Sequence, residues 1–256
     1  MKRFFLIGLI ASAAFAQGTI EIRKNGKVVA TDHDQSTDAV RVLFIGNSLT
    51  FWNEMPWMTR RVAGSLGSKL VTQFSGASGA TLRQHWERGR ALRAIKERHW
   101  DFVVLQAQSS EMSTRPEETM EYARLFDREI DRVGAKTVIF ETWRIVNADL
   151  TARYVALELD AALAPIGSAW EELRSKGIDL FDPGGVHPNL KGSYLSACIF
   201  YATFWGKSPE GATHSFETKF DIPESYRHDL EYDRIDAATA EQIQRAAWKA
   251  VQAFKR

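Results

Sequence analysis

Short apolar runs alternate with longer amphipathic stretches along the chain from residue 41 onward. The short runs predict buried strands, and apolar residues spaced three or four apart predict helices. Strands are expected at residues 41–45, 69–74, 102–105, 137–140 and 178–181. Helices are expected at residues 54–66, 82–97, 116–133, 150–175 with a break near Pro165, 189–204 and 237–254. An irregular stretch, 206–236, separates the last two helices.

This alternation predicts one α/β domain over residues 41–256. Strands that are apolar on both faces are typical of a parallel sheet with a helix layer on each side, and right-handed crossovers supply both layers. We therefore expect a three-layer α/β/α sandwich around a parallel sheet of about five strands. In such sheets ligands bind beyond the carboxyl ends of the strands, so candidate site residues are sought there.

The first 40 residues have a different character. Lys2 and Arg3 precede an apolar run at 4–15, and small residues near Ala16 complete the pattern of a secretory signal peptide, expected to be cleaved after Ala16. A membrane anchor is the weaker alternative, because roughly a dozen apolar residues fall short of the ~20 that span a bilayer. Residues 17–40 predict a hairpin or loose lead-in, with a turn at Asn25 and Gly26. We expect a secreted or periplasmic protein without stable membrane insertion after cleavage.

The charge balance and the single cysteine limit which binding partners and which nucleophile are expected. The chain has 33 Lys and Arg against 32 Asp and Glu, without a basic cluster, so no binding to nucleic acid is expected. Its one cysteine, Cys198, lies in an apolar stretch. It is expected to be a buried small hydrophobe, without an internal disulfide. A catalytic thiol is disfavoured there, because apolar surroundings raise the pKa of a thiol.

Ser48 lies between the first expected strand and the following helix, where a nucleophile could be exposed at the edge of the sheet. Gly46 allows the chain to turn tightly. The helix start offers N–H groups and a positive dipole end to a developing oxyanion. The alternative is that Ser48 only caps the helix, since serine is common at that position.

His187 follows the last expected strand, so it should lie at the same sheet edge as Ser48. An imidazole, with an ordinary pKa of about 6.5, can accept the proton of a serine hydroxyl and return it later. The alternative is a surface histidine ahead of a helix. A zinc site that combines His85 with His187 is not expected, because no second histidine or carboxylate lies at a helical ligand spacing.

These segments resemble the first and last blocks of the SGNH (GDSL-like) hydrolases. Residues 46–49 resemble the first block, and His187 with Gly192 and Tyr194 resembles the last, in the same order along the chain. The resemblance covers roughly residues 41–205. It implies a flavodoxin-like sandwich and hydrolysis or transfer of an acyl ester, with Ser48 as nucleophile, His187 as general base, and neither cofactor nor metal.

The resemblance also implies an oxyanion hole made by the N–H groups of Ser48 and Gly79 and by an amide side chain. Gly76 is a nearby rival of Gly79. Gln108 stands where the family has an asparagine, and its carboxamide can donate the same kind of hydrogen bond. Asn47 replaces the usual aspartate of the first block and is expected, like the oxyanion groups, to contact the substrate.

The triad acid departs most from the family pattern. The family places it three residues before the histidine, where this chain has Gly184. Asp182 lies five residues before, and the glycines between allow the loop to bring it to the imidazole. Asp179, Glu141 or a backbone carbonyl are alternatives, as is a Ser-His dyad. Asp182 could also be only a turn residue.

The substrate is the least determined feature. Trp143 follows the fourth expected strand and is expected to contact a substrate, because flat aromatic surfaces suit sugar rings. The sequence therefore predicts an exported serine esterase acting on a small-molecule or glycan ester, with carbohydrate esters first and lipid esters or thioesters second. The alternative of a different class is a non-catalytic glycan-binding relative, indicated by the missing acid at position 184.

Overall fold

A computed structural model describes residues 19–24, 27–33, 38–143, 148–216 and 234–254, in two compact units, Met1–Asp38 and Ala39–Arg256. In the first unit β1 (Thr19–Lys24) and β2 (Lys27–His33) pair in antiparallel register, as expected for a hairpin. The expected turn at residues 25 and 26 and the expected signal peptide at 1–16 lie outside the described residues.

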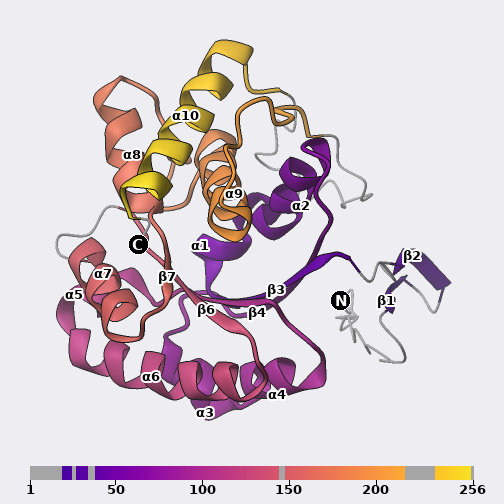
Figure 1. The fold of residues 1–256 in the computed structure, drawn as a ribbon, viewed down its shortest axis with the longest axis vertical. Helices are drawn as coiled ribbons and strands as arrows, with labels where there is room; N and C mark the ends of the chain where they lie inside the picture. The colour runs from indigo at the N-terminus through magenta and orange to yellow at the C-terminus, as the bar shows by residue number, and fades with distance from the viewer. Residues whose placement is uncertain (1–18, 25–26, 34–37, 144–147, 217–233, 255–256) are drawn as a thin grey trace, which may run out of the picture. The chain divides into compact units, whose positions relative to one another are not determined.

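The second unit is built on a five-stranded sheet in the order β4-β3-β5-β6-β7, with every neighbouring pair parallel (Figure 1). Numbered within this unit, the order is 2-1-3-4-5, the flavodoxin-like arrangement. The predicted fold class is therefore confirmed. The strands are β3 (Val40–Gly46), β4 (Leu70–Gly76), β5 (Phe102–Leu105), β6 (Lys136–Phe140) and β7 (Ala162–Ala164).

Helices cover both faces of this sheet, as Figure 1 shows. The helices above the sheet in that view are α2 (Met55–Ser65), α8 (Ile166–Ser175), α9 (Leu190–Trp205) and α10 (Ala237–Ala253). The helices on the opposite face are α3 (Leu82–Arg88), α4 (Arg90–Glu97), α5 (Ser109–Thr114), α6 (Pro116–Arg132) and α7 (Ala148–Glu158). Within the described part of the chain, no helix has the length and apolar character to cross a bilayer.

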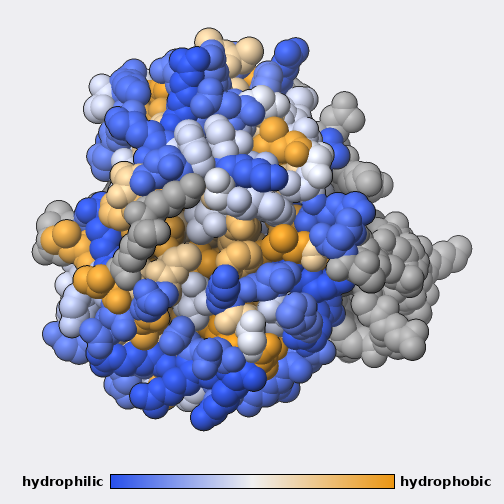
Figure 2. Space-filling view, viewed as in Figure 1, coloured by the Kyte–Doolittle hydropathy of each residue, from blue (hydrophilic) through white to orange (hydrophobic). Residues whose placement is uncertain are grey.

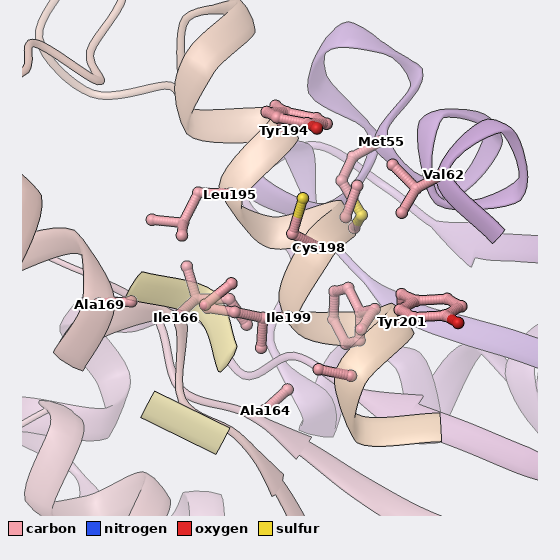
Figure 3. Packing of buried hydrophobic residues seen from close by; sticks show 14 of the residues in the cluster. Met55, Val62, Ala164, Ile166, Ala169, Tyr194, Leu195, Cys198, Ile199 and Tyr201 are labelled. Atoms are coloured by element: carbon pink, nitrogen blue, oxygen red, sulfur yellow. The ribbon is translucent and has the colours of Figure 1, made fainter. Parts of the chain in front are cut away.

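Alternate side chains of the central strand enter the two cores. Val42 and Phe44 join the core beneath α2, α8, α9 and α10, whereas Leu43 and Ile45 join the core of the opposite face. All four are fully buried, and full burial of such a side chain stabilises the fold by about 1.5–3 kcal/mol. Helix α9 is apolar nearly all round, which is typical of a buried helix. In Figure 3 its residue Cys198 packs among the apolar side chains, as predicted for this cysteine.

The prediction of the fifth strand was wrong. Residues 178–181 form no strand, and the β pairing at Phe181 is an isolated bridge to Pro188. The fifth strand is β7, which lies inside the stretch 150–175 that we expected to be a broken helix. That stretch is rich in alanine, which favours helices and is depleted in strands. Pairing with β6 overrides this local preference.

The helices also differ from the prediction in places. The expected helix at 82–97 is divided into α3 and α4 at Gly89, which has φ +67° and so interrupts the helix. A four-residue helix, α1 (Ser48–Phe51), and a 3-10 turn, η1 (Trp52–Glu54), precede α2 and were not predicted. They place the segment from Ser48 to Glu54 directly after the carboxyl end of β3.

Candidate active site

Ser48 is the first residue of α1 and lies immediately beyond β3. The helix is capped by the preceding residue, because Asn47 Oδ1 accepts a hydrogen bond from Leu49 N at 3.1 Å. The hydroxyl of Ser48 is thus not used as the cap, which was the alternative reading of this serine. Ser48 Oγ instead lies 3.0 Å from His187 Nε2, a distance typical of a hydrogen bond. The side chain is 9% exposed.

Gln106, directly after β5, stabilises the turn that contains Ser48. Its fully buried side-chain oxygen accepts hydrogen bonds from Asn47 N at 2.8 Å and from Thr50 Oγ1 at 3.0 Å. Its Nε2 donates to Ala107 O at 2.6 Å. We did not predict this role. The available signal was a carboxamide directly after the apolar strand at 102–105, where a buried polar side chain needs partners.

His187 lies in a loop that closes on itself between Phe181 and Pro188. Asp182 N donates to His187 O at 2.9 Å, and Asp182 Oδ1 accepts from His187 N at 3.2 Å and from Val186 N at 3.3 Å. Asp182 Oδ2 is 3.8 Å from His187 Nδ1, within ion-pair range but beyond a hydrogen bond. Asp182 therefore shapes the loop and also faces the imidazole. The structure brings Ser48, His187 and Asp182 together, and their catalytic roles stay predictions.

The other carboxylates considered as triad acids have different partners. Glu141 is fully buried and accepts hydrogen bonds from Ser168 N and Oγ, both at 2.8 Å, and Arg153 lies beside it. Burial raises its pKa, and these hydrogen bonds and the guanidinium oppose the rise. Asp179 Oδ1 accepts from Phe181 N at 3.2 Å. Of the three candidates, Asp182 is the carboxylate placed against His187.

A tryptophan that the prediction did not assign to the site covers the imidazole. The rings of Trp52 and His187 are stacked, with centroids 3.8 Å apart and planes 11° from parallel. The next residue, Asn53, has φ +51°, and its Nδ2 donates to Pro188 O and to Ser193 Oγ, both at 2.9 Å. Trp52 lies four residues after Ser48, a helical spacing that puts two side chains on one face. This spacing was the signal in the sequence.

The expected oxyanion groups lie in three different settings. Gly79 has φ +64°, and a Cβ built there meets nothing within 4 Å, so its backbone borders open space. Gly76 is packed into the sheet, where an added Cβ would lie 2.3 Å from Gly46 O. Gln108 Oε1 caps α5 by accepting from Glu111 N at 2.7 Å, which leaves its Nε2 group as the donor. The roles of Gly79 and Gln108 stay predictions.

Two expected substrate contacts are packing residues in the structure. Trp143 is 3% exposed and stacks on Trp170 with ring centroids 4.1 Å apart. Asn47 is also buried, and its Nδ2 donates to Ala80 O at 3.2 Å. Position at the carboxyl end of a strand was correctly predicted for both, but the direction of the side chain was not. The residues that follow Trp143, 144–147, lie outside the described residues.

His85 lies beside the backbone of Gly46, in the turn that leads to Ser48. It is buried, and burial lowers its pKa. Its Nε2 has no hydrogen-bond partner among the described residues. Within the same residues, no group of three or more His, Cys, Asp and Glu side chains is arranged to hold a metal ion.

A cavity of about 440 Å³ lies elsewhere, along β7 between α7, α9 and α10. Arg153, Leu157 and Phe254 are among the residues that line it, and none of the predicted site residues does. Figure 2 shows apolar residues gathered in a band across the middle of this face, between the polar outer surfaces of the two helix layers. Because none of the predicted site residues lines it, the cavity is separate from the Ser48–His187 pair.

Comparison with known proteins places this arrangement in a structural class. No protein-family model matches the chain, and no curated protein is significantly similar to it in sequence. A candidate SGNH hydrolase from Slackia heliotrinireducens is similar in structure, with 27% identity and a TM-score of 0.54 over 65% of this chain and 99% of that one.

Two further solved structures share the fold at lower identity. A DUF4886 family protein from Bacteroides uniformis has 15% identity and a TM-score of 0.65 over 84% of this chain and 95% of that one. The psychrotrophic esterase EstA from Pseudoalteromonas sp. has 16% identity and a TM-score of 0.52 over 64% of this chain and 96% of that one. The parallel sheet, the two helix layers and these structural relatives together show that the chain has the fold of the SGNH hydrolases.

Proposed function

We propose that this protein is an exported serine hydrolase of acyl esters, with Ser48 as nucleophile and His187 as general base. The observation that supports it is the distance of 3.0 Å between Ser48 Oγ and His187 Nε2 at the carboxyl end of the sheet. A serine hydroxyl is hardly ionised at neutral pH, so a base within hydrogen-bond distance is the first requirement for its activation.

In the proposed reaction His187 Nε2 takes the proton from Ser48 Oγ as this oxygen attacks the ester carbonyl carbon. The carbonyl π electrons move onto oxygen, and the N–H groups of Ser48 and Gly79, with Gln108 Nε2, stabilise that charge. The imidazolium then donates its proton to the leaving alkoxide, which gives an acyl-enzyme. Water attacks the acyl-enzyme by the same route and restores Ser48.

Asp182 is the proposed triad acid. Its carboxylate lies near Nδ1 of His187, so it favours the tautomer with the proton on Nδ1 and stabilises the imidazolium that forms. At 3.8 Å in a half-exposed loop the effect is weaker than that of a buried, hydrogen-bonded aspartate. We therefore propose a triad in which Asp182 contributes only modestly.

Carbohydrate esters are the proposed substrates, followed by lipid esters and thioesters. The proposal is supported by the signal-peptide pattern at residues 1–16 and by half-exposed aromatic side chains near the site, such as Trp52. Trp143 no longer supports it, since this side chain is buried. Turnover of acetylated oligosaccharides, p-nitrophenyl butyrate and a fatty acyl thioester by the same preparation would rank the three classes.

The test of an activated serine is covalent labelling by a fluorophosphonate, followed by intact-mass measurement. The Pseudoalteromonas esterase structure is described as inhibited by monoethylphosphonate, a reagent of related chemistry. We expect one adduct on Ser48, none in Ser48→Ala, and labelling slowed by about 10²- to 10⁴-fold in His187→Ala, the usual contribution of a general base.

The chain offers a matched control for each variant. Ser175 is an exposed serine outside the site, and His99 is an exposed histidine with Asp101 at 3.6 Å, much as His187 has Asp182. Ser175→Ala and His99→Ala should be labelled like the wild type. An adduct at another residue would contradict the proposed nucleophile. No adduct in folded protein would favour a non-catalytic glycan-binding protein, the function that the missing acid at Gly184 indicates.

A further inference from the structure

The imidazole of His187 is held on three sides by different segments. Ser48 Oγ lies at Nε2, Asp182 lies toward Nδ1, and the indole of Trp52 covers one face of the ring. Neither Ser48 nor Trp52 is charged, so among these three contacts Asp182 is the charged one. The first two contacts lie at the ring nitrogens, whereas Trp52 covers a face of the ring.

The contacts at the two ring nitrogens do not by themselves fix the orientation of the ring. A separation of 3.8 Å between Asp182 Oδ2 and His187 Nδ1 is too long for a hydrogen bond that would fix the ring plane. The torsion that rotates an imidazole about its Cβ–Cγ bond has a broad profile, so it needs a contact to fix it. A stacked indole with planes 11° from parallel supplies that contact.

The indole is itself fixed to the histidine loop. Asn53, the residue after Trp52, donates from Nδ2 to the carbonyl of Pro188, the residue after His187. Ser193 Oγ accepts from the same Nδ2 and donates to Trp52 O at 3.4 Å. These hydrogen bonds link the segment that carries Trp52 to the segment that follows His187.

We propose that Trp52 is a positioning residue for the hydrolysis, because its stacked ring holds His187 in the plane from which Nε2 reaches Ser48. The inference rests on the proposed function and adds to it a residue outside the family blocks. Trp52 does not touch the reacting atoms. It acts on the step in which the Ser48 proton passes to His187 Nε2 while the Oγ–C bond forms.

The same contact favours the charged product of that step. When His187 holds two protons, its positive charge lies over the face of the indole, which carries the negative part of the ring quadrupole. The interaction is therefore stronger in the tetrahedral intermediate than in the resting enzyme. An interaction of this kind raises kcat and leaves KM largely unchanged.

Two substitutions distinguish the effect of the aromatic face of Trp52 from the effect of its side-chain volume. Trp52→Phe keeps an aromatic face over the imidazole, and Trp52→Leu keeps apolar volume without one. For p-nitrophenyl butyrate we expect Trp52→Leu to lower kcat and the rate of fluorophosphonate labelling by about tenfold with KM little changed. Trp52→Phe should recover most of the loss. The control is Trp57→Leu, since Trp57 is also half-buried but packs edge-on against Phe216.

A second measurement reports the stack without activity. Protons above an aromatic ring are shifted upfield, so the ring CH signals of His187 should be upfield in the wild type and return toward ordinary values in Trp52→Leu. They should stay upfield in Trp57→Leu. A His187→Gln variant assigns the signals among the six histidines of the chain.

The outcomes distinguish the inference from the function beneath it. Slower labelling in Trp52→Leu, rescue in Trp52→Phe and a Trp52-dependent upfield shift support the inference. If Ser48 is labelled equally fast in the wild type, Trp52→Leu and Trp57→Leu, the inference is overturned and the serine hydrolase stands. If the wild type is not labelled although the upfield shift is present, the proposed function is overturned. The role of Trp52 in that reaction is then overturned as well.

Discussion

The nucleophile turn, residues 46–50, and the histidine loop, residues 181–188, meet at one hydrogen bond but are held in place by opposite means. The turn is buried and packed against the end of the sheet, and Gln106 satisfies its polar groups from within. The loop is half-exposed and contains Gly184 and Gly185, and its hydrogen bonds run mainly among its own residues.

This contrast indicates where substitutions should have their effects. In the nucleophile turn, changes alter packing and buried hydrogen bonds, so the free energy of unfolding should fall first. In the histidine loop, changes alter the orientation of one ring, so the reaction should slow while stability changes little. The following substitutions test that division.

Replacement of Gln106 by alanine should have the largest effect on stability. The variant leaves Asn47 N and Thr50 Oγ1 buried without an acceptor, at about 1–3 kcal/mol for each group. We expect a loss of about 2–4 kcal/mol in urea unfolding. The control is Gln108→Ala, which removes the cap of α5 and should cost about 1 kcal/mol. Equal losses in the two variants would contradict the support that we assign to Gln106.

A pair of glycine-to-alanine substitutions compares the two regions directly. A Cβ at Gly46 would lie 2.5 Å from Thr50 Oγ1 and 2.7 Å from Gln106 Oε1, so Gly46→Ala should destabilise the fold by about 1–3 kcal/mol. The atoms nearest to a Cβ at Gly184 are those of the Asp182 carboxylate, at 3.5 Å, an ordinary contact. Gly184→Ala should therefore change stability by less than about 0.5 kcal/mol. A loss at Gly184 as large as at Gly46 would show that the loop is packed like the turn.

Substitution of Asp182 should slow the reaction with little loss of stability. Asp182→Asn keeps an oxygen for the N–H groups of Val186 and His187 but removes the charge near Nδ1. We expect the labelling rate and kcat to fall by about tenfold and the free energy of unfolding to change by less than about 0.5 kcal/mol. A large loss of stability with normal labelling would assign Asp182 a purely structural role.

A relocated carboxylate sharpens this test. An added Cβ at Gly184 lies 3.5 Å from both carboxylate oxygens of Asp182, so a side chain there enters the same space. The double variant Asp182→Asn, Gly184→Asp returns the acid to the position implied by the family pattern. We expect it to recover part of the activity lost in Asp182→Asn, measured as kcat for p-nitrophenyl butyrate. No recovery would indicate that the backbone at position 184 directs the side chain away from His187.

The sequence predicted the nucleophile turn better than the histidine loop, and for a physical reason. Ser48 follows a continuous apolar strand, and local pattern is sufficient to place it. His187 was expected to follow a strand at 178–181, but a loop closed by Asp182 brings it to Ser48 instead. That placement depends on contacts between residues about 140 positions apart, which no local pattern contains.

The misplaced side chains have a related cause. Periodicity correctly placed Trp143 and Asn47 at the carboxyl ends of strands, but whether a side chain there turns outward depends on its packing partner, such as Trp170. The amide assigned to the oxyanion hole shows the same limit. Gln106 and Gln108 lie two residues apart, and only the structure shows that the first supports the turn while the second caps α5.

Glu111 tests the same division with a smaller expected effect. It is an ionisable residue in the buried part of α5, three residues after Gln108. Its side chain is 2% exposed, neither carboxylate oxygen has a hydrogen-bond partner among the described residues, and Arg115 is 3.6 Å away. Burial raises its pKa. The native state therefore holds this proton more tightly than the unfolded chain, and stability falls as pH rises from the unfolded pKa to the folded one.

Glu111→Gln should remove that pH-dependent cost. We expect it to be more stable than the wild type by about 1 kcal/mol at pH 8 and the difference to vanish near pH 4, measured by urea unfolding. Glu129→Gln is the opposite control, because a hydrogen bond from Lys96 lowers the pKa of Glu129 and its charge stabilises the fold above the unfolded pKa. That variant should lose stability at pH 8 and recover as pH falls. Since neither residue touches His187, both variants should be labelled at the wild-type rate, and slower labelling in Glu111→Gln would show that the buried region also controls the reaction.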